Sequence, residues 1–280
     1  MRIIKMNTKA FKENVSETLL IPLVCKAEET IMKSPIIKDY VARDILNKLN
    51  MNLEKYKNKK ISRVGTAIRT KYFDEEVMLF ISKTERPIIV MLGCGLDSRY
   101  DRLPPDLIEK AFFVYLDFDD VINLRKELIP ERINEKYIGG DILYESWVDK
   151  VKIFSDKNTN YMFLLEGVVM YIEKDSLKSL MKMLCHNFNS GVILFDTLSY
   201  SMSKNSEKHD TIKYSKSKFV FGFDCDRELE SWDVHLKYKK TKLFSEFKEC
   251  RRFGLMTYFL MSFIPKYKNA SRMITYKINQ

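Results

Sequence analysis

The sequence predicts an α/β domain, with a doubly wound, mostly parallel sheet that follows a helical N-terminal segment. Three observations carry this prediction. Short, β-rich apolar runs recur after residue 86, segments of helical character lie between them, and a glycine or an acidic residue stands just past the end of four runs. Strands that alternate with helices form right-handed βαβ units, so most strands should be parallel, with helices on both faces of the sheet.

The composition fits a folded protein with one substantial core. The chain has 280 residues, of which 45% are hydrophobic and 31% charged, and a chain of this length buries a large share of its apolar surface. A net charge of +10 raises the question of a nucleic-acid partner. Because the lysines are spread along the chain and not interleaved with aromatic residues, we expect a solvated surface and no nucleic-acid partner.

The cysteines and the apolar stretches favour a cytoplasmic protein. Five widely spaced cysteines form no C-x-x-C pair and have no histidine at ligand spacing, which predicts reduced thiols and no metal site. The first residues lack the apolar core of a signal peptide. Residues 253–264, the most apolar late stretch, are fewer than the roughly 20 that a membrane span needs. We therefore expect no membrane partner, and the oligomeric state stays open.

Helical patterns fill the first part of the chain. Apolar residues recur at helical spacing after Pro35 and again across residues 64–81, without strand-like alternation. We therefore expect residues 1–85 to form a helical N-terminal cap and residues 86–280 to form the α/β core.

The first predicted strand, residues 88–92, follows a break at Pro87 and ends in glycine. It is apolar throughout, which is typical of a strand buried on both faces. Similar runs predict the other strands of the core: residues 112–116, 136–138, 161–165, 192–195 and, by alternation, 273–278. Helices are expected between them, at residues 121–128 and 175–187.

The pattern loosens after the fifth predicted strand. Residues 199–218 are polar and rich in serine and lysine, without clear periodicity, whereas residues 243–248 look helical. A region of about residues 198–250 is therefore expected to be an insertion, either a lid above the sheet or a surface excursion.

Four residues mark the ends of successive strands. Gly93, Asp117, Asp141 and Glu166 follow one another at intervals of about 24 or 25 residues, and ligands of open α/β sheets bind outside the carboxyl ends of the strands. Gly93 and Gly95 allow a sharp turn and a close approach to a ligand. Asp117 is placed to accept hydrogen bonds from both hydroxyls of a ribose. Asp141 is placed to accept one from the amine of adenine, and Glu166 would lie near the charged end of the cofactor.

Each acidic residue also has a purely structural interpretation. Asp97 and Arg99 fit a helix-start cap with a neighbouring salt bridge. Asp119 and Asp120 fit the first turn of a helix, where the dipole favours acids. Asp141, taken singly, is more often a loop cap than a ligand. The regular spacing of the four strand-end residues is what favours a binding site.

Electrostatics separates the two cofactor classes that fit such a site. A dinucleotide brings an anionic pyrophosphate, which a glycine-rich helix start meets best, and here Ser98 stands where the third glycine of that fingerprint belongs. Acidic groups at three successive strand ends would repel it. S-adenosylmethionine has no phosphate and carries a cationic sulfonium and ammonium, so the sequence favours this cofactor over a nicotinamide.

Four motifs, in order along the chain, resemble the leucine carboxyl methyltransferase family. They are Arg-Thr-Lys-Tyr-Phe-Asp at residues 69–74, Gly-Cys-Gly-Leu-Asp-Ser-Arg at 93–99, Tyr-Leu-Asp-Phe-Asp at 115–119 and Glu-Gly-Val-Val-Met-Tyr-Ile at 166–172. They are most similar to its bacterial branch, the tetracenomycin-polyketide-type O-methyltransferases. The resemblance implies a Rossmann-like class I S-adenosylmethionine-dependent methyltransferase fold with a helical N-terminal cap.

The resemblance also implies roles for individual residues. Arg69 would pair with the carboxylate of S-adenosylmethionine, Ile142 would frame the adenine together with Asp141, and Lys26 stands where the family has a basic residue. The implied cofactor-binding residues are Lys26, Arg69, Gly93, Gly95, Asp117, Asp141, Ile142 and Glu166.

The expected acceptor is the carboxylate of a small molecule such as a polyketide-like acid. A carboxylate is ionised at neutral pH, so its methylation requires proximity and orientation and no general base. The alternatives are the C-terminal carboxylate of a protein and, less favoured, a nicotinamide-dependent reductase. A phenolic acceptor would need a base, for which Tyr171 or a histidine of the loosely patterned region is the candidate.

Overall fold

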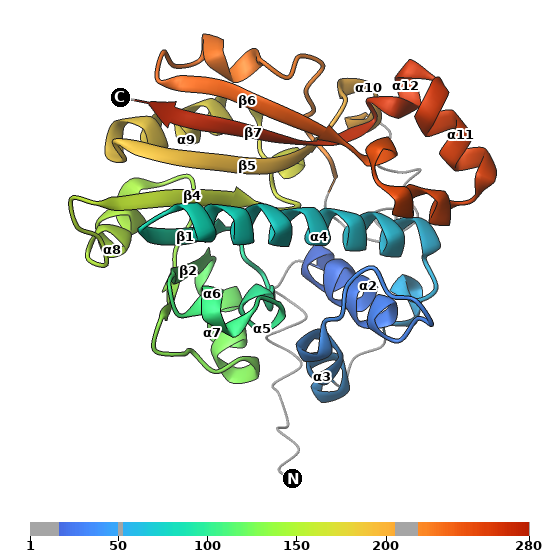
Figure 1. Ribbon diagram of the computed structural model, residues 1–280, viewed down its shortest axis with the longest axis horizontal. Coiled ribbons are helices and arrows are strands. Elements are labelled where there is room, and N and C mark those ends of the chain that lie inside the picture. The colour runs from blue at the N-terminus through green and yellow to red at the C-terminus, as the bar shows by residue number, and fades with distance from the viewer. Residues whose placement is uncertain (1–16, 50–52, 205–217, 280) are drawn as a thin grey trace.

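The computed structural model describes residues 17–49, 53–204 and 218–279. Seven strands form one sheet: β1 (Arg86–Leu92), β2 (Phe112–Asp117), β3 (Glu135–Gly139), β4 (Thr159–Leu165), β5 (Ser190–Leu198), β6 (Leu236–Leu243) and β7 (Ser271–Asn279). Their order is β3-β2-β1-β4-β5-β7-β6 (Figure 1). The first five are parallel, and β7 runs antiparallel to both β5 and β6. The strand order therefore changes direction between β1 and β4, which is where such sheets bind ligands.

The α-helices are α2 (Leu20–Thr30), α3 (Tyr40–Lys48), α4 (Lys60–Lys83), α5 (Arg99–Arg102), α6 (Pro105–Ile108), α7 (Asp119–Leu128), α8 (Val148–Lys152), α9 (Lys174–Asn187), α10 (Tyr200–Ser203), α11 (Leu255–Phe263) and α12 (Pro265–Lys268). The 3-10 turns are η1 (Glu17–Leu19), η2 (Glu54–Tyr56), η3 (Glu145–Trp147), η4 (Val169–Tyr171), η7 (Glu228–Ser231), η8 (Phe244–Glu246) and η9 (Lys248–Phe253). The helices expected at residues 121–128 and 175–187 correspond to α7 and α9.

Both faces of the sheet are covered, as the unbroken apolar strands predict. On one face, Ile89 and Met91 of β1 pack in a cluster with Phe73 of α4, and α4 lies across this face in Figure 1. On the other face, Val90 of β1 packs in a cluster with Leu177 of α9. Successive strand residues point to opposite faces, so a strand between two helical layers is apolar at every position.

The N-terminal helices lie at the carboxyl ends of the parallel strands. A third apolar cluster joins Val24 of α2 and Ile45 of α3 to Leu124 of α7 and to Leu96, which follows β1. Among the described residues, the segment before β1 contains helices and 3-10 turns and no strand, in agreement with the sequence prediction. Residues 1–16 and 50–52 of the expected helical segment lie outside the described residues.

The range expected as an insertion after the fifth strand needs a correction. Residues 236–243, within that range, form β6, the edge strand of the sheet. Edge strands tolerate and often carry lysines, so this strand has a polar, lysine-rich sequence instead of an apolar run. Residues 243–248, expected to be helical, contain the end of β6 and 3-10 turns. The connection from β5 to β6 is thus residues 199–235, of which 205–217 lie outside the described part.

Candidate functional site

The structure brings the four strand-end residues to one edge of the sheet. Gly93 follows β1, Asp117 ends β2, Asp141 lies two residues after β3, and Glu166 follows β4 directly. These four parallel strands are neighbours in the order β3-β2-β1-β4. The regular spacing in the sequence therefore corresponds to one row of residues along the carboxyl edge.

The turn after β1 has a backbone that only glycine adopts easily. Gly93 and Gly95 have φ angles of +76° and +52°, in the left-handed region that side chains disfavour. A Cβ on Gly93 would lie 2.7 Å from Cγ2 of Val168. The turn is tied to β2, because the amide nitrogens of Gly93 and Cys94 donate to the carbonyl of Leu116 at 2.8 and 3.0 Å.

The carboxylate of Asp117 faces this turn. Its Oδ2 accepts from the amide of Gly95 at 2.7 Å, and its Oδ1 accepts from the amide of Phe118 at 2.8 Å. Burial raises the pKa of Asp117, and these two amides counteract the effect. No ion pair to this carboxylate occurs within the described residues. A carboxylate has about four acceptor sites, so each oxygen retains capacity for a ligand hydroxyl.

Arg125 of α7 contacts the backbone of the turn after β1. Its side chain is completely buried, and its guanidinium carbon lies 3.8 Å from the ring centre of Tyr115 and 4.6 Å from that of Tyr137. Nη1 donates to the carbonyl oxygens of Gly95 and Asp97 at 3.3 and 2.6 Å. The cation therefore holds two carbonyls of the turn while the aromatic rings stabilise its charge. Arg125 belongs to none of the sequence motifs that predicted the site.

Glu166 lies at the centre of a group of cations. Its Oε1 accepts from Nε of Arg69 at 3.3 Å and from the hydroxyl of Thr70 at 2.8 Å, and its Oε2 accepts from Nη2 of Arg99 at 2.5 Å. Burial alone would raise the pKa of Glu166, but the guanidinium groups of Arg99 and Arg69 hold it below its ordinary value. The carboxylate is thus ionised and fixed in orientation.

Asp196 of β5 is a site residue that the sequence analysis missed. Its Oδ2 accepts from Nη1 of Arg69 at 3.0 Å, and its Oδ1 accepts from the amide of Gly167 at 2.6 Å. The residue lies in β5, two residues before its end, and belongs to none of the quoted motifs. Its position directly after the predicted apolar run 192–195 is the signal that could have identified it.

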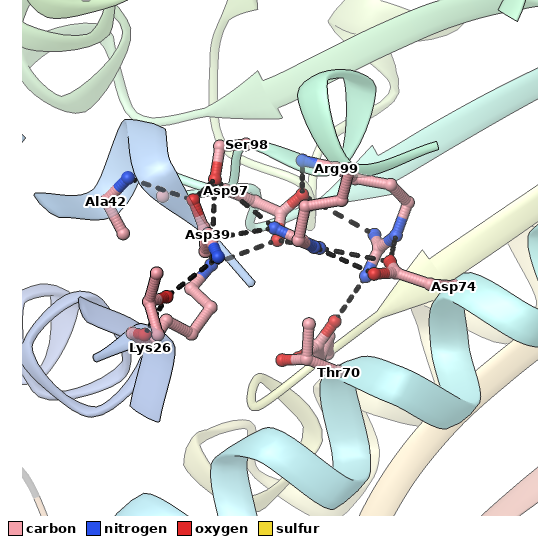
Figure 2. A network of polar contacts seen from close by, with 12 residues as sticks. Lys26, Asp39, Ala42, Thr70, Asp74, Asp97, Ser98 and Arg99 are labelled. Atoms are coloured by element: carbon pink, nitrogen blue, oxygen red, sulfur yellow. Dashed lines mark hydrogen bonds and ion pairs between the residues drawn. The ribbon is translucent and has the colours of Figure 1, made fainter. Parts of the chain in front are cut away.

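A larger ion-pair network connects this group to the N-terminal helices (Figure 2). Asp74 of α4 accepts from Nε of Arg99 and from Nε of Arg102, both at 2.7 Å. Nη1 of Arg102 reaches Oδ2 of Asp39, before α3, at 2.9 Å. The hydroxyl of Ser98, which replaces the fingerprint glycine, donates to the same Asp39 carboxylate at 2.7 Å. These buried pairs fix the turn relative to the helical cap.

Lys26 of α2 belongs to the same network. Its Nζ lies 3.2 Å from Oδ2 of Asp97 and 3.7 Å from Oδ2 of Asp39, and its side chain is only 5% exposed. Asp97 also accepts from the amide of Arg99 at 2.8 Å. This contact at the start of α5 agrees with the structural interpretation of Asp97 and Arg99. Burial alone would raise the pKa of Asp97, but Arg99, Lys26 and Arg102 hold it well below its ordinary value.

Asp141 and Ile142 lie at the β3 end of the row. Oδ1 of Asp141 accepts from the amide of Leu143 at 2.9 Å, which makes it a loop cap, and Ile142 is buried in the core. The side chain of Asp119 approaches this end too, because a Cβ on Gly139 would lie 2.0 Å from its Oδ1.

A family model described as leucine carboxyl methyltransferase matches residues 20–185, which is more than half of the chain. The chain belongs to the leucine carboxyl methyltransferase family. Over 227 residues, 81% of this chain and 82% of the relative, it is 25% identical to the tetracenomycin polyketide synthesis O-methyltransferase TcmP of Streptomyces glaucescens. The resemblance inferred from the four motifs is thereby confirmed.

Solved structures share the fold of this leucine carboxyl methyltransferase family member. A DUF574 family protein from Streptomyces avermitilis aligns over 92% of this chain and 97% of its own, with a TM-score of 0.58 and 9% identity. A protein from Thermobifida fusca aligns over 92% and 95%, with a TM-score of 0.56 and 10% identity. The sheet has the Rossmann-like methyltransferase architecture that the resemblance implied.

As a member of this family, the protein is an S-adenosylmethionine-dependent methyltransferase and not a nicotinamide-dependent reductase. The residues at the strand ends fit S-adenosylmethionine in charge and in shape. The carboxylates of Asp117, Glu166 and Asp196 suit a cationic cofactor without phosphate, and the turn has no side chain at positions 93 and 95, where φ is positive. Nη2 of Arg69 has no hydrogen-bond partner within the described residues, so it can still donate to a carboxylate. No cluster of three or more metal-ligating side chains occurs in the described part of the chain.

Proposed function

We propose that this methyltransferase transfers the methyl group to a carboxylate of a small molecule, such as a polyketide-like acid. The proposal rests on the surroundings of the candidate base, Tyr171, whose ring centre lies 5.4 Å from that of Phe219, and on the described histidines, which lie away from this edge. The hydroxyl of Tyr171 belongs to η4, next to the site, and burial raises its pKa further above the ordinary value, with Arg69 opposing the effect. A nucleophile that is already ionised suits such a site, and a carboxylate is ionised at neutral pH.

The described histidines give no alternative base at this edge. His235 precedes β6 and has its Nδ1 3.1 Å from the carbonyl of Asn279, at the last residue of β7. His186 is at the end of α9, with its Nε2 3.8 Å from Asp233. Both lie at the opposite edge of the sheet, where β5 begins. His209, in the loosely patterned region, is outside the described residues.

The descriptions of the family and of one relative support a carboxylate of a small molecule as the acceptor. The family description concerns a carboxyl group, and the Streptomyces glaucescens relative is an O-methyltransferase of polyketide synthesis. The alignment with this relative spans most of both chains. We therefore favour a small acid over the C-terminal carboxylate of a protein. The five cysteines, none of them in a disulfide, support a cytoplasmic location for the reaction.

We assign the cofactor contacts as follows. The amino-acid end would meet Nη2 of Arg69 and the carboxylate of Glu166, and the ribose hydroxyls would bind the free acceptor positions of Asp117. Asp141 and Ile142 would contact the adenine, and the backbone of Gly93 and Gly95 would lie against the cofactor. Lys26 would act through Asp97, because its ammonium is already engaged there. When bound, S-adenosylmethionine supplies a methyl group on a cationic sulfur, which an ionised carboxylate oxygen can displace in line.

The chain then contributes orientation and exclusion of water. The ion pairs of Arg99 and Arg69 hold Glu166 in one geometry, which is the kind of preorganisation that brings reacting atoms together. Leu19 covers the glycine turn, because a Cβ on Gly95 would lie 2.8 Å from its Cδ1.

We further propose that the connection between β5 and β6 forms part of the acceptor side. It returns to the site at Phe219, whose ring centre lies 5.4 Å from that of Tyr171. The next residue, Val220, donates its amide to the carbonyl of Met170 at 2.9 Å.

The acceptor class is tested with methyl-labelled S-adenosylmethionine. The protein is offered a panel of aromatic polyketide-like acids, the matching methyl esters and phenols, and a peptide that ends in leucine. We expect label in an alkali-labile ester of one or more of the acids, and none in the blocked esters. Transfer to the leucine peptide alone would establish the protein acceptor, and transfer to phenols alone would contradict the carboxylate proposal.

The Tyr171→Phe variant supplies the matched control. If the acceptor is a carboxylate, the variant should retain its rate within about tenfold and its pH profile between neutral and mildly alkaline pH, because no proton is removed. Loss of a general base typically reduces the rate by about 100- to 10,000-fold, so a loss of that size would place Tyr171 in the proton transfer.

A further inference from the structure

One helix near the end of the chain presents an uncovered apolar face. In α11, Leu255, Met256, Phe259 and Phe263 are exposed to 83%, 73%, 54% and 67%. Leu255, Phe259 and Phe263 are spaced four residues apart, which places them in one row along the helix. Isolated exposed apolar residues are ordinary, but a contiguous row of this kind marks an interaction surface.

The opposite side of α11 fixes it to the protein. Met261 packs against the apolar cluster that includes Phe73 of α4, and its sulfur lies 3.8 Å from Sγ of Cys250. The ring of Tyr258 lies under the guanidinium of Arg251 at 5.6 Å. The helix is thus apolar on both sides, and a helix of that kind is normally covered on both. Here one side is covered by the protein and the other is not.

Cationic residues flank this helix in the sequence. Arg251 precedes the helix, Lys266 and Lys268 follow it, and all three are exposed. None of them forms an ion pair with the residues that the structure describes. No aspartate or glutamate occurs after Glu249, so every charged side chain after that residue is a cation.

We propose that α11 and its flanking cations dock this protein onto the surface of an anionic lipid bilayer. A short helix with an apolar row and basic neighbours lies in the plane of the membrane interface, with its apolar side chains below the headgroups and its cations among them. Nine residues span about 13 Å, and no helix of the described residues is long and apolar enough to cross a membrane. The expectation of no membrane partner, which rested on the absence of such a span, does not cover this kind of contact.

The charges favour a lipid surface over a second copy of the chain. A twofold contact through α11 would bring like cations from two copies together, and the segment after Glu249 contains no acidic side chain to neutralise them. An anionic bilayer neutralises these cations and covers the apolar row at the same time. In Figure 1, α11 lies toward the same end of the molecule as α2, where β4 ends. The helix precedes β7, which begins beside the end of β5, so α11 lies near the carboxyl edge of the sheet.

Cosedimentation of the full-length protein with vesicles tests the proposal. The vesicles contain phosphatidylcholine alone or phosphatidylcholine with phosphatidylglycerol, at low and at high salt. We expect binding to the anionic vesicles that weakens with salt and little binding to the neutral ones. The double variant Phe259→Ser with Phe263→Ser should bind at least about tenfold more weakly, and so should Lys266→Gln with Lys268→Gln.

Ile133→Ser is the matched control, because Ile133 is 100% exposed and lies away from α11, before β3. It should bind as tightly as the native chain. All variants change exposed side chains, and thermal unfolding checks that they are folded. No binding to anionic vesicles would overturn the proposal, and so would unchanged binding of the double phenylalanine variant. A dimer in solution that this variant dissociates would assign the face to a second copy instead.

Discussion

Nη1 of Arg69 lies 3.0 Å from Oδ2 of Asp196, and this ion pair links α4, which covers one face of the sheet, to the fifth strand. Glu166, 3.3 Å from Nε of the same guanidinium, completes a group of one cation and two acids. Asp196 is 4% exposed in its side chain and has no second cation within 4.0 Å among the described residues. Arg69 is therefore the one cation that pairs with Asp196 among the described residues, whereas Glu166 also pairs with Arg99.

The Arg69→Met variant should be less stable than the native protein. Removing one partner of a buried ion pair leaves an uncompensated charge and typically costs about 3–5 kcal/mol. Burial already raises the pKa of Asp196, and Arg69 is what opposes that effect. Without the arginine the folded-state pKa rises further above the unfolded value. The deficit should therefore be full at neutral pH and shrink as the pH falls through the raised folded-state pKa. Urea unfolding at several pH values measures this.

The double variant Arg69→Met with Asp196→Asn is the control for that prediction. Its unfolding free energy should recover much of the loss at neutral pH, because the amide carries no charge and can still accept from Gly167. An equal deficit in both variants, independent of pH, would contradict the paired-charge explanation.

Asp117→Asn should weaken binding of S-adenosylhomocysteine by at least about tenfold. The amide removes the charge and one acceptor, and a hydrogen bond to a charged group contributes about 1.5–3 kcal/mol. Titration calorimetry measures the dissociation constant. Asp120→Asn, an exposed acid in the first turn of α7, is the matched control and should bind normally. An unchanged constant for the Asp117 variant would refute the ribose assignment.

Gly93→Ala should abolish cofactor binding, whereas Gly254→Ala should leave it intact. Both glycines have positive φ angles, but a Cβ on Gly93 would meet Val168 at 2.7 Å and one on Gly254 would meet nothing within 4 Å. The comparison separates backbone strain, which both variants share, from obstruction of the turn. Circular dichroism melting reports the shared strain, and calorimetry reports binding. Normal binding by Gly93→Ala would mean that the cofactor does not lie against this turn.

Arg125→Met should destabilise the turn without touching the cofactor. The carbonyls of Gly95 and Asp97 would lose a charged donor, with a loss of about 1.5–3 kcal/mol for each bond. We expect a lower unfolding free energy and a weaker affinity for S-adenosylhomocysteine, and the lost stability should be partly regained at saturating cofactor, because ligand binding stabilises the folded state. Full stability and normal affinity in this variant would contradict the role of Arg125 in holding the turn.

Much of the fold could be predicted because it depends on local patterns. An apolar run that ends in glycine specifies a buried strand followed by a turn, and this held for β1. The spacing of Asp117 and Glu166 relative to Gly93 placed all three at one edge, since parallel strands share the direction of their ends. The lysine-rich β6 was not predicted, because an edge strand is partly exposed to solvent and its sequence need not be an apolar run.

The sequence alone therefore determined the architecture, the cofactor class and the row of residues at the strand ends, because periodicity and glycine turns are properties of neighbouring residues. The tertiary structure decided which charges meet. Arg69 and Asp196 are 127 positions apart, and Arg125 lies beneath a turn 28 residues before it. Such pairs depend on the order of strands and on the packing of helices onto the sheet, and local sequence patterns do not predict these features.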